Sequence, residues 1–241
     1  MSPETFQRAT TYPYRIPERS FVFTDGKEHP LTSEADLPNL KGRTPVLAVG
    51  SNQSPEQLVR KFHEPDWGPI PVVKTRLKDF DSVYSPHIAS YGAIAATLQH
   101  APGVTVDLFI TWLTEPQLER MHETEVSAAN YGFGRIDGIE INNEFGPKLD
   151  HLHIYNSKRG TLCNNDKPVP LAEVSAEGRR WTAMTQIDVL HHVRDRLQPD
   201  HDLKRFIRDS VANADLRRER SDTLKHGARP FSHPRFIEIA I

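Results

Sequence analysis

The strongest constraint on the fold is an alternation of residue types in the middle of the chain. Every second position from 104 to 112 is large and apolar. Because successive side chains of a strand point to opposite faces of a sheet, this period of two predicts a strand with one buried face. Pro102 and Gly103 predict a turn just before it. The apolar positions are Val104, Val106, Leu108, Ile110 and Trp112, and between them lie Thr105, Asp107, Phe109 and Thr111.

A short apolar run, PVLAVG at residues 45–50, predicts a second, fully buried strand. The pattern that follows is typical of a helix start, with Ser54 as the N-cap, Pro55 at the first helical position and Gln57 able to complete a capping box. We therefore expect a strand that breaks at Gly50 and continues as a helix. Further strands are expected over residues 71–84, 91–98, 131–141 and 149–155.

The charge balance favours neither a nucleic-acid partner nor an acidic tail. The chain has 241 residues, with 30 Lys and Arg against 32 Asp and Glu, and its net charge is -2. Its single cysteine, Cys163, excludes an intrachain disulfide and is typical of a reducing compartment. No targeting pattern is present, and no apolar stretch approaches the roughly 20 residues of a membrane span. We therefore expect a cytoplasmic protein with no membrane contact.

The chain divides into three predicted parts. Residues 1–44 form an N-terminal arm packed on the core, residues 45–160 a strand-rich domain, and residues 161–241 a C-terminal helical extension. Apolar stripes at helical spacing predict two helices in the extension, and residues 235–241 predict an edge strand or docking arm. The stripes are Ile187, Leu190, Val193 and Leu197, and then Leu203, Phe206, Ile207 and Val211.

The extension also carries a charged run, Arg217-Arg218-Glu219-Arg220, which is typical of the solvated end of a helix. Three roles for the extension stay open at this point. It covers the mouth of a pocket, it forms a homodimer interface, or it only stabilises the core.

One carboxylate of the helix expected at residues 116–125 lies on its apolar side. Leu118, Met121 and Glu125 share a face, whereas Glu119 and Glu123 fall elsewhere. An inward carboxylate is costly unless it is hydrogen-bonded or lines a cavity, and burial generally makes a carboxyl a better general base near neutral pH. The other interpretation is a residue at a frayed helix end that turns to water.

Three stretches resemble, in the right order, motifs of the gamma-glutamylcyclotransferase-like family. LAVGSNQSPEQL is similar to the family's strand, Tyr-Gly-Ser loop and helix. YGAIAATLQHAPGVTVDLFITWL is similar to its glycine, Ala-Thr strand, turn and apolar strand, and LERMHETEVSAANY to its Leu-Asp-x-x-Glu helix end with a later tyrosine. The match spans about residues 45–141. It implies an α+β fold in which helices flank a small mixed β-barrel.

The resemblance also implies a reaction and a set of site residues. In this family the α-amine of a gamma-glutamyl amide or peptide attacks its own side-chain carbonyl. The products are 5-oxoproline and an amine or amino acid, and no metal or cofactor takes part. The family's catalytic glutamate falls on Glu125, which would act as general base. The substrate-binding positions fall on Val49, Gly50, Ser51, Asn52 and Tyr131.

Three departures from the family pattern leave the substrate open. Val49 replaces the loop tyrosine, His122 replaces the aspartate of the helix motif, and Val126 replaces a glycine. A non-catalytic small-molecule-binding module or scaffold on the same fold is therefore the main alternative.

Two other site chemistries have weaker support in the sequence. A serine hydrolase at Gly50-Ser51 would lack the second glycine of G-x-S-x-G. A metal site at His151 and His153 would lack a recognised ligand spacing.

Overall fold

The computed structural model describes residues 1–64, 66–126 and 129–241, and Ser127 and Ala128 of the third family-like motif lie outside this part. The described chain contains six α-helices, a ten-stranded mixed sheet and a two-stranded sheet, which confirms the predicted α+β class. No closed barrel is found among the described residues. None of the helices described is both long and apolar enough to cross a membrane.

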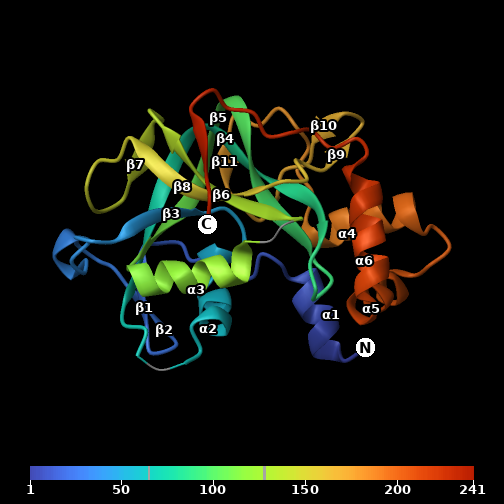
Figure 1. Ribbon diagram of the computed structural model, residues 1–241, viewed down its shortest axis with the longest axis horizontal. Coiled ribbons are helices and arrows are strands. Elements are labelled where there is room, and N and C mark those ends of the chain that lie inside the picture. Colours follow the sequence, from blue (N-terminus) through green and yellow to red (C-terminus); the bar gives the residue numbers. More distant parts are fainter. Residues whose placement is uncertain (65, 127–128) are drawn as a thin grey trace.

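The helices form two groups. Their bounds are α1 Pro3–Thr10, α2 Pro55–Lys61, α3 Glu115–Glu125, α4 Gln186–Leu197, α5 Leu203–Ala212 and α6 Ala214–Lys225, with short 3-10 turns η1 Glu34–Asp36 and η2 Ser51–Gln53. Helices α2 and α3 lie side by side under the sheet, whereas α1 packs with α4, α5 and α6 at one end of the molecule (Figure 1).

The large sheet has the order β12-β6-β8-β3-β5-β4-β1-β2, with β11 added to β5 and β7 to β4. Its pairings are antiparallel except for β3 with β8. The strands are β1 Phe21–Thr24, β2 Lys27–Pro30, β3 Thr44–Ala48, β4 Ile70–Ile88, β5 Ile94–Leu113, β6 Tyr131–Asp137, β7 Ile141–Asn143, β8 His151–Ser157, β9 Cys163–Asn164, β10 Lys167–Pro168, β11 Ala176–Glu177 and β12 Phe236–Ile239.

Strand β3 is covered on both faces, which explains its unbroken apolar run. Leu47 packs in one hydrophobic cluster, which the C-terminal helices also join, and Val46 packs in a second cluster with residues of α2 and α3. Phe109 and Thr111 of the neighbouring β5 are likewise buried. The prediction of a single buried face for residues 104–112 is therefore wrong at the end that lies beside β3.

The turn predicted at Pro102 and Gly103 is also wrong, because β5 continues through it. Gly103 has a φ of 85°, and its N–H donates to Asp79 on β4 at 2.7 Å. The register between the two strands shifts beside Asp79. The left-handed glycine produces an irregularity in the ladder, and the two strands expected there are one.

The C-terminal extension has three helices where the sequence predicted two. The charged run lies inside α6, and Arg220 is buried, with hydrogen bonds to the Phe206 carbonyl at 3.0 Å and the Ser210 hydroxyl at 2.6 Å. The interpretation of this run as a solvated helix end is therefore wrong. The expected edge strand is present as β12, which pairs with β6.

Phe206 anchors the extension, because its ring is fully buried under the Arg220 guanidinium. Phe206→Ala should lower the free energy of unfolding by about 3–5 kcal/mol through the cavity it leaves. Ile187→Ala, on the exposed side of α4, should change it by less than about 1 kcal/mol. Urea denaturation of both variants measures the difference. Equal effects would mean that the extension is not packed as described.

Candidate active site

A cavity of about 440 Å³ opens where β3 ends. It is lined by every residue that the sequence assigned to a site: Val49, Gly50, Ser51, Asn52, Glu125 and Tyr131. These residues come from the turn after β3, the last residue of α3 and the first residue of β6. The volume lies in the usual range for small-molecule sites. The fold therefore brings together residues up to about eighty positions apart in the chain.

Glu125 lies in the cavity wall with its side chain 20% exposed. Its Oε1 pairs with the Lys61 ammonium and accepts a hydrogen bond from Asn52 Nδ2 at 3.0 Å. No hydrogen bond engages Oε2 in the described part of the chain. The frayed-end interpretation does not hold, since the carboxylate is fixed by two partners. One of its oxygens is left for a ligand.

Lys61 is the partner that the sequence analysis missed. It ends α2, is only 4% exposed, and lies 3.3 Å from the Met121 sulfur. Burial lowers the pKa of Lys61, while the charge of Glu125 and the hydrogen bond to it raise it. The sequence did contain a signal for a buried Lys61. Leu58 and Lys61 are three residues apart, so they share the side of α2 that is buried.

The loop at 49–52 is held from behind by buried polar side chains. Ser82 Oγ donates to the Val49 carbonyl at 2.8 Å, and Gln53 Nε2 donates to the Val49 and Gly50 carbonyls at 3.2 Å each. In a planar trans peptide the N–H points away from the preceding carbonyl. The N–H groups of Gly50 and Ser51 are therefore directed away from Gln53. Ser54 is the N-cap of α2 as predicted, but its hydroxyl makes no capping bond.

Tyr12 of the N-terminal arm supplies a phenol at this loop. Its hydroxyl accepts the Ala96 N–H at 2.9 Å and lies close to Gly50 of the turn. A Cβ on Gly50 would lie 2.1 Å from this oxygen, so the residue there must be glycine. Val49 stands where the family has its loop tyrosine. The Tyr12 hydroxyl, from another part of the chain, reaches the same turn. No local pattern around Tyr12 predicts this.

Tyrosines surround the candidate base. Burial is the main cause that raises the pKa of Tyr12, Tyr91, Tyr131 and Tyr155, and the negative charge of Glu125 contributes to each. Tyr131 donates to the Ala96 carbonyl at 2.8 Å. All four phenols therefore stay protonated near neutral pH, so they can donate hydrogen bonds but cannot act as bases.

A different part of the wall carries His87 of β4 and Arg217 of α6. Burial lowers the pKa of His87 to about 4, helped by the charges of Arg159 and Arg217. The imidazole is therefore neutral at pH 7, and its Nδ1 has no partner in the described structure. Its ring meets Tyr131 edge-on, with 5.8 Å between centroids. Sequence reasoning selected neither residue.

The other departures from the family pattern fill space around Glu125. His122 Nδ1 hydrogen-bonds with the Tyr155 hydroxyl at 2.8 Å, and its ring packs edge-on against Phe133. Val126 is half-buried and also lines the cavity. His122, which stands where the family has an aspartate, thus packs among neutral aromatic side chains.

The histidines weighed as metal ligands have other roles. His151 hydrogen-bonds to Asp150 at 2.9 Å, and His153 stacks on Phe133 with 5.3 Å between centroids. Within residues 1–64, 66–126 and 129–241, no group of three or more His, Cys, Asp or Glu side chains is placed to hold a metal ion.

No protein-family model, curated protein or solved structure matches the chain. The assignment of function therefore rests on the geometry of the cavity. That geometry combines an ionisable carboxylate with one free oxygen, a turn whose carbonyls are held by buried side chains, and protonated phenols. Such a set can accept a proton from a bound amine and donate hydrogen bonds to a carbonyl oxygen.

The contact between Tyr12 and Gly50 predicts a coupled pair of substitutions. Gly50→Ala should destabilise the protein by about 1–3 kcal/mol, because the new methyl overlaps the Tyr12 hydroxyl. Adding Tyr12→Phe should restore part of that loss, although Ala96 Cβ would still lie 2.8 Å from the new methyl. Tyr14→Phe is the matched control, since the Tyr14 hydroxyl has no partner in the described structure. Denaturation midpoints that are additive in the double variant would contradict the contact.

The buried ion pair predicts a pH dependence. In Glu125→Gln the charge that raises the pKa of Lys61 is lost, so that pKa should fall further below its ordinary value. The unfolded chain then binds more protons below about pH 10, and stability must rise with pH in that range. We expect a deficit of about 1–3 kcal/mol at pH 7 that shrinks towards pH 10.

The double variant Lys61→Met, Glu125→Gln is the control and should lack this slope. Chemical denaturation between pH 6 and 10 measures all three proteins. Parallel profiles for the wild type and Glu125→Gln would contradict a charged Lys61 held by Glu125.

Proposed function

We propose that the chain is an enzyme of the gamma-glutamylcyclotransferase type, which cyclises a gamma-glutamyl amide or peptide to 5-oxoproline. The observation that carries this proposal is the free Oε2 of Glu125 in a cavity that also contains the turn at 49–52. The finer fold assignment, a small mixed barrel of that family's type, belongs to the same proposal. The order of strand, loop and helix at 44–61 supports it.

The proposed reaction begins with the α-ammonium group of the substrate beside Glu125. The carboxylate takes a proton, and the freed amine attacks the side-chain carbonyl carbon to close a five-membered ring. The bond from that carbon to the departing nitrogen then breaks. Over the reaction the attacking nitrogen loses two protons and the departing nitrogen gains two, so Glu125 ends as the carboxylate it began as.

Positioning supplies much of the rate in such a reaction. Nucleophile and electrophile belong to one molecule, so the protein has only to hold a folded conformer of the substrate. The cavity can do this with Glu125 on the amine and with the loop N–H groups on the carbonyl oxygen, where negative charge develops. Asn52 links the two parts, because its side chain binds Glu125 and its backbone lies in the loop.

Lys61 has two consequences for the proposed base. Its ammonium supplies the counter-charge of the carboxylate in the ligand-free site, and it holds Oε1 so that Oε2 faces the ligand. Lys61 also competes with the substrate ammonium for Glu125, because that carboxylate is already paired. The arrangement suits brief proton exchange better than tight retention of a cation.

A binding module for an amino-acid-like ligand is the second candidate. The observation that favours it is the Tyr12 hydroxyl, which already lies against Gly50 of the turn in the cavity wall. A ligand oxygen would have to displace the phenol or use the remaining donors. This would be consistent with binding that is not followed by chemistry.

The test is release of 5-oxoproline from gamma-glutamyl-alanine and gamma-glutamyl-ethylamide by the purified protein. Glu125→Gln should lower kcat by about 100-fold or more, as expected for loss of a general base. Glu119→Gln, an exposed carboxylate on the same helix, should leave kcat unchanged.

Product formation at the wild-type rate by Glu125→Gln would overturn the proposed mechanism, provided that thermal melting finds the variant folded. Absence of product from any gamma-glutamyl compound, together with thermal stabilisation by the same compounds, would favour the binding module.

A further inference from the structure

The cavity of the proposed reaction centre adjoins a second cavity that is lined by arginines. A second cavity of about 200 Å³ shares three lining residues with the first, namely His87, Asn130 and Arg217. Arg159 and Arg218 also line it. The arginines come from the segment after β8 and from α6, so the C-terminal extension builds one wall of this region.

The Arg217 guanidinium is held in place while keeping its charge available. Its Nη1 donates to the carbonyls of Ser210 and Val211, at 2.8 and 3.4 Å, where α5 ends. No carboxylate pairs with Arg217 within the described residues. The other guanidinium nitrogens are left for a ligand, and the fork geometry of arginine matches a carboxylate.

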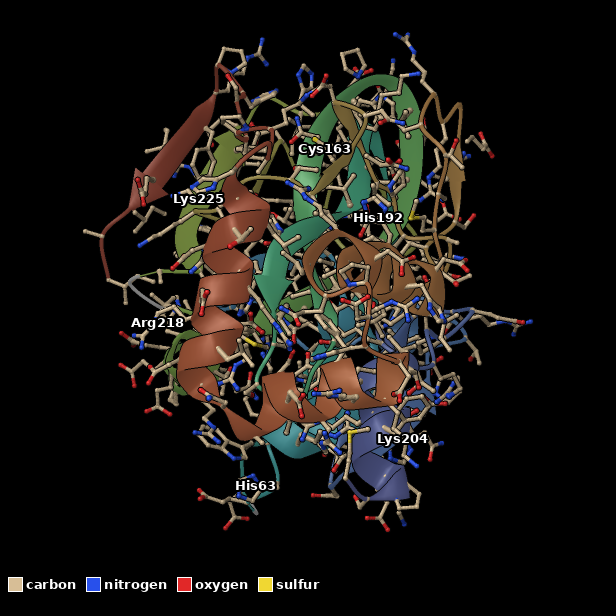
Figure 2. The ribbon with its side chains drawn as sticks, turned by 90° about the vertical axis from the view of Figure 1, so that its right-hand side faces the viewer. His63, Cys163, His192, Lys204, Arg218 and Lys225 are labelled. Carbon is tan, nitrogen blue, oxygen red and sulfur yellow. The ribbon has the colours of Figure 1, made fainter. Side chains whose placement is uncertain are left out.

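The neighbouring arginines differ from Arg217 because acidic partners compensate them. Arg159 pairs with Asp222 at 2.6 Å, and Arg218 pairs with Asp215. Figure 2 shows Arg218 on α6, where its side chain is exposed. Of the arginines that line the two cavities, Arg217 is the one that the described structure leaves without a counter-charge.

The acidic residues of the larger cavity do not provide that counter-charge. Glu125 pairs with Lys61, and Glu123 pairs with Arg120 at 2.8 Å. His87 is neutral at pH 7 and adds no charge. An anionic group on a ligand would therefore be favoured at Arg217.

The charges of Glu125 and of the arginines act on different groups in the cavity wall. The charge of Glu125 raises the pKa of Tyr12, Tyr91 and Tyr131, whereas the charges of Arg159 and Arg217 lower that of His87. Glu125 and Arg217 come from different elements, α3 and α6, and both line the larger cavity, so one ligand can contact both.

We propose that Arg217 binds a carboxylate on the leaving group, so that the substrates are gamma-glutamyl amino acids or peptides and not gamma-glutamyl amines. The identity of the glutamyl half rests on the proposed function. The carboxylate subsite rests on the basic region itself. The α-carboxylate of the glutamyl half is a poor occupant, because it is attached to the same carbon as the amine that must meet Glu125.

A subsite at Arg217 gives the C-terminal extension a role beyond the three that the sequence left open. The extension contributes a specificity residue to the cavity wall, because α6 carries Arg217 and α5 supplies the carbonyls that orient it. Helix α6 is fastened to the sheet by the Ser221 hydroxyl, which accepts the Ile88 N–H at 3.1 Å, and by the pair of Arg159 with Asp222.

The test uses three ligands that cannot cyclise, because each lacks the α-amine. Glutaryl-alanine keeps both carboxylates, glutaryl-ethylamide lacks the one on the leaving group, and butanoyl-alanine lacks the one on the glutamyl half. Calorimetry on the wild type should give a Kd for glutaryl-alanine about 10- to 100-fold below that for glutaryl-ethylamide. In Arg217→Met this ratio should fall to near one, with binding of glutaryl-ethylamide unchanged.

Two further variants separate the charge of Arg217 from its packing. Arg217→Lys should keep part of the preference, because it retains the charge without the fork. Arg218→Met, at the adjacent exposed position, should keep all of it. Unchanged binding of glutaryl-ethylamide in Arg217→Met also reports that the variant is folded.

Two results would overturn the subsite. One is a wild type that binds no ligand or does not distinguish glutaryl-alanine from glutaryl-ethylamide. The other is an Arg217→Met variant that weakens glutaryl-ethylamide but not butanoyl-alanine, which would place the glutamyl carboxylate at Arg217.

The experiments can reject the proposed function and the carboxylate subsite separately. Selective binding of glutaryl-alanine without release of 5-oxoproline from gamma-glutamyl-alanine would remove the reaction and leave the subsite. Release of 5-oxoproline with no dependence of kcat/KM on Arg217 would keep the reaction and remove the subsite.

Discussion

The ion pair between Lys61 and Glu125 is the interaction on which the rest of the site depends. A lysine that is 4% exposed is stable as a cation only beside an opposite charge, and a carboxylate at a helix end is oriented only when something holds it. Each residue meets the requirement of the other. Because Lys61 ends α2 and Glu125 ends α3, the pair joins the two helices at the cavity.

The same ion pair also fixes the turn at 49–52, which lines the cavity. Helix α2 follows directly from the turn at 51–53, so its position determines where Asn52 can reach. Asn52 then binds the oxygen of Glu125 that Lys61 also holds. Behind the turn, Gln53 and Ser82 hold its carbonyls away from the cavity. The geometry of the loop and that of the carboxylate are therefore one linked arrangement.

Local sequence patterns predicted much of this fold. The α+β class, β3, the starts of α2 and α3 and the edge strand β12 follow from apolar periodicity and capping residues over a few positions. Two errors have local causes. Gly103 suggested a turn, but a positive φ also fits an irregularity inside a ladder. Helix α6 lacks an apolar stripe, since its buried residues are Arg220, Ser221 and Leu224.

The site was predictable only where it lies on such patterns. Glu125 stood out because it shares a face with Leu118 and Met121, and the loop because a strand ends there. Tyr12 and Arg217 come from the two ends of the chain and meet the cavity through tertiary contacts with Gly50 and with the end of α5. Nothing in their neighbourhoods encodes those contacts. Two of the three departures from the family pattern, Val49 and Val126, thus lie on the same cavity as Tyr12 and Arg217. Its distribution of charge is a carboxylate paired with Lys61 at one part of the wall and an uncompensated arginine at another, and this is the distribution that the proposed ligand, with its amine and its leaving-group carboxylate, has to match.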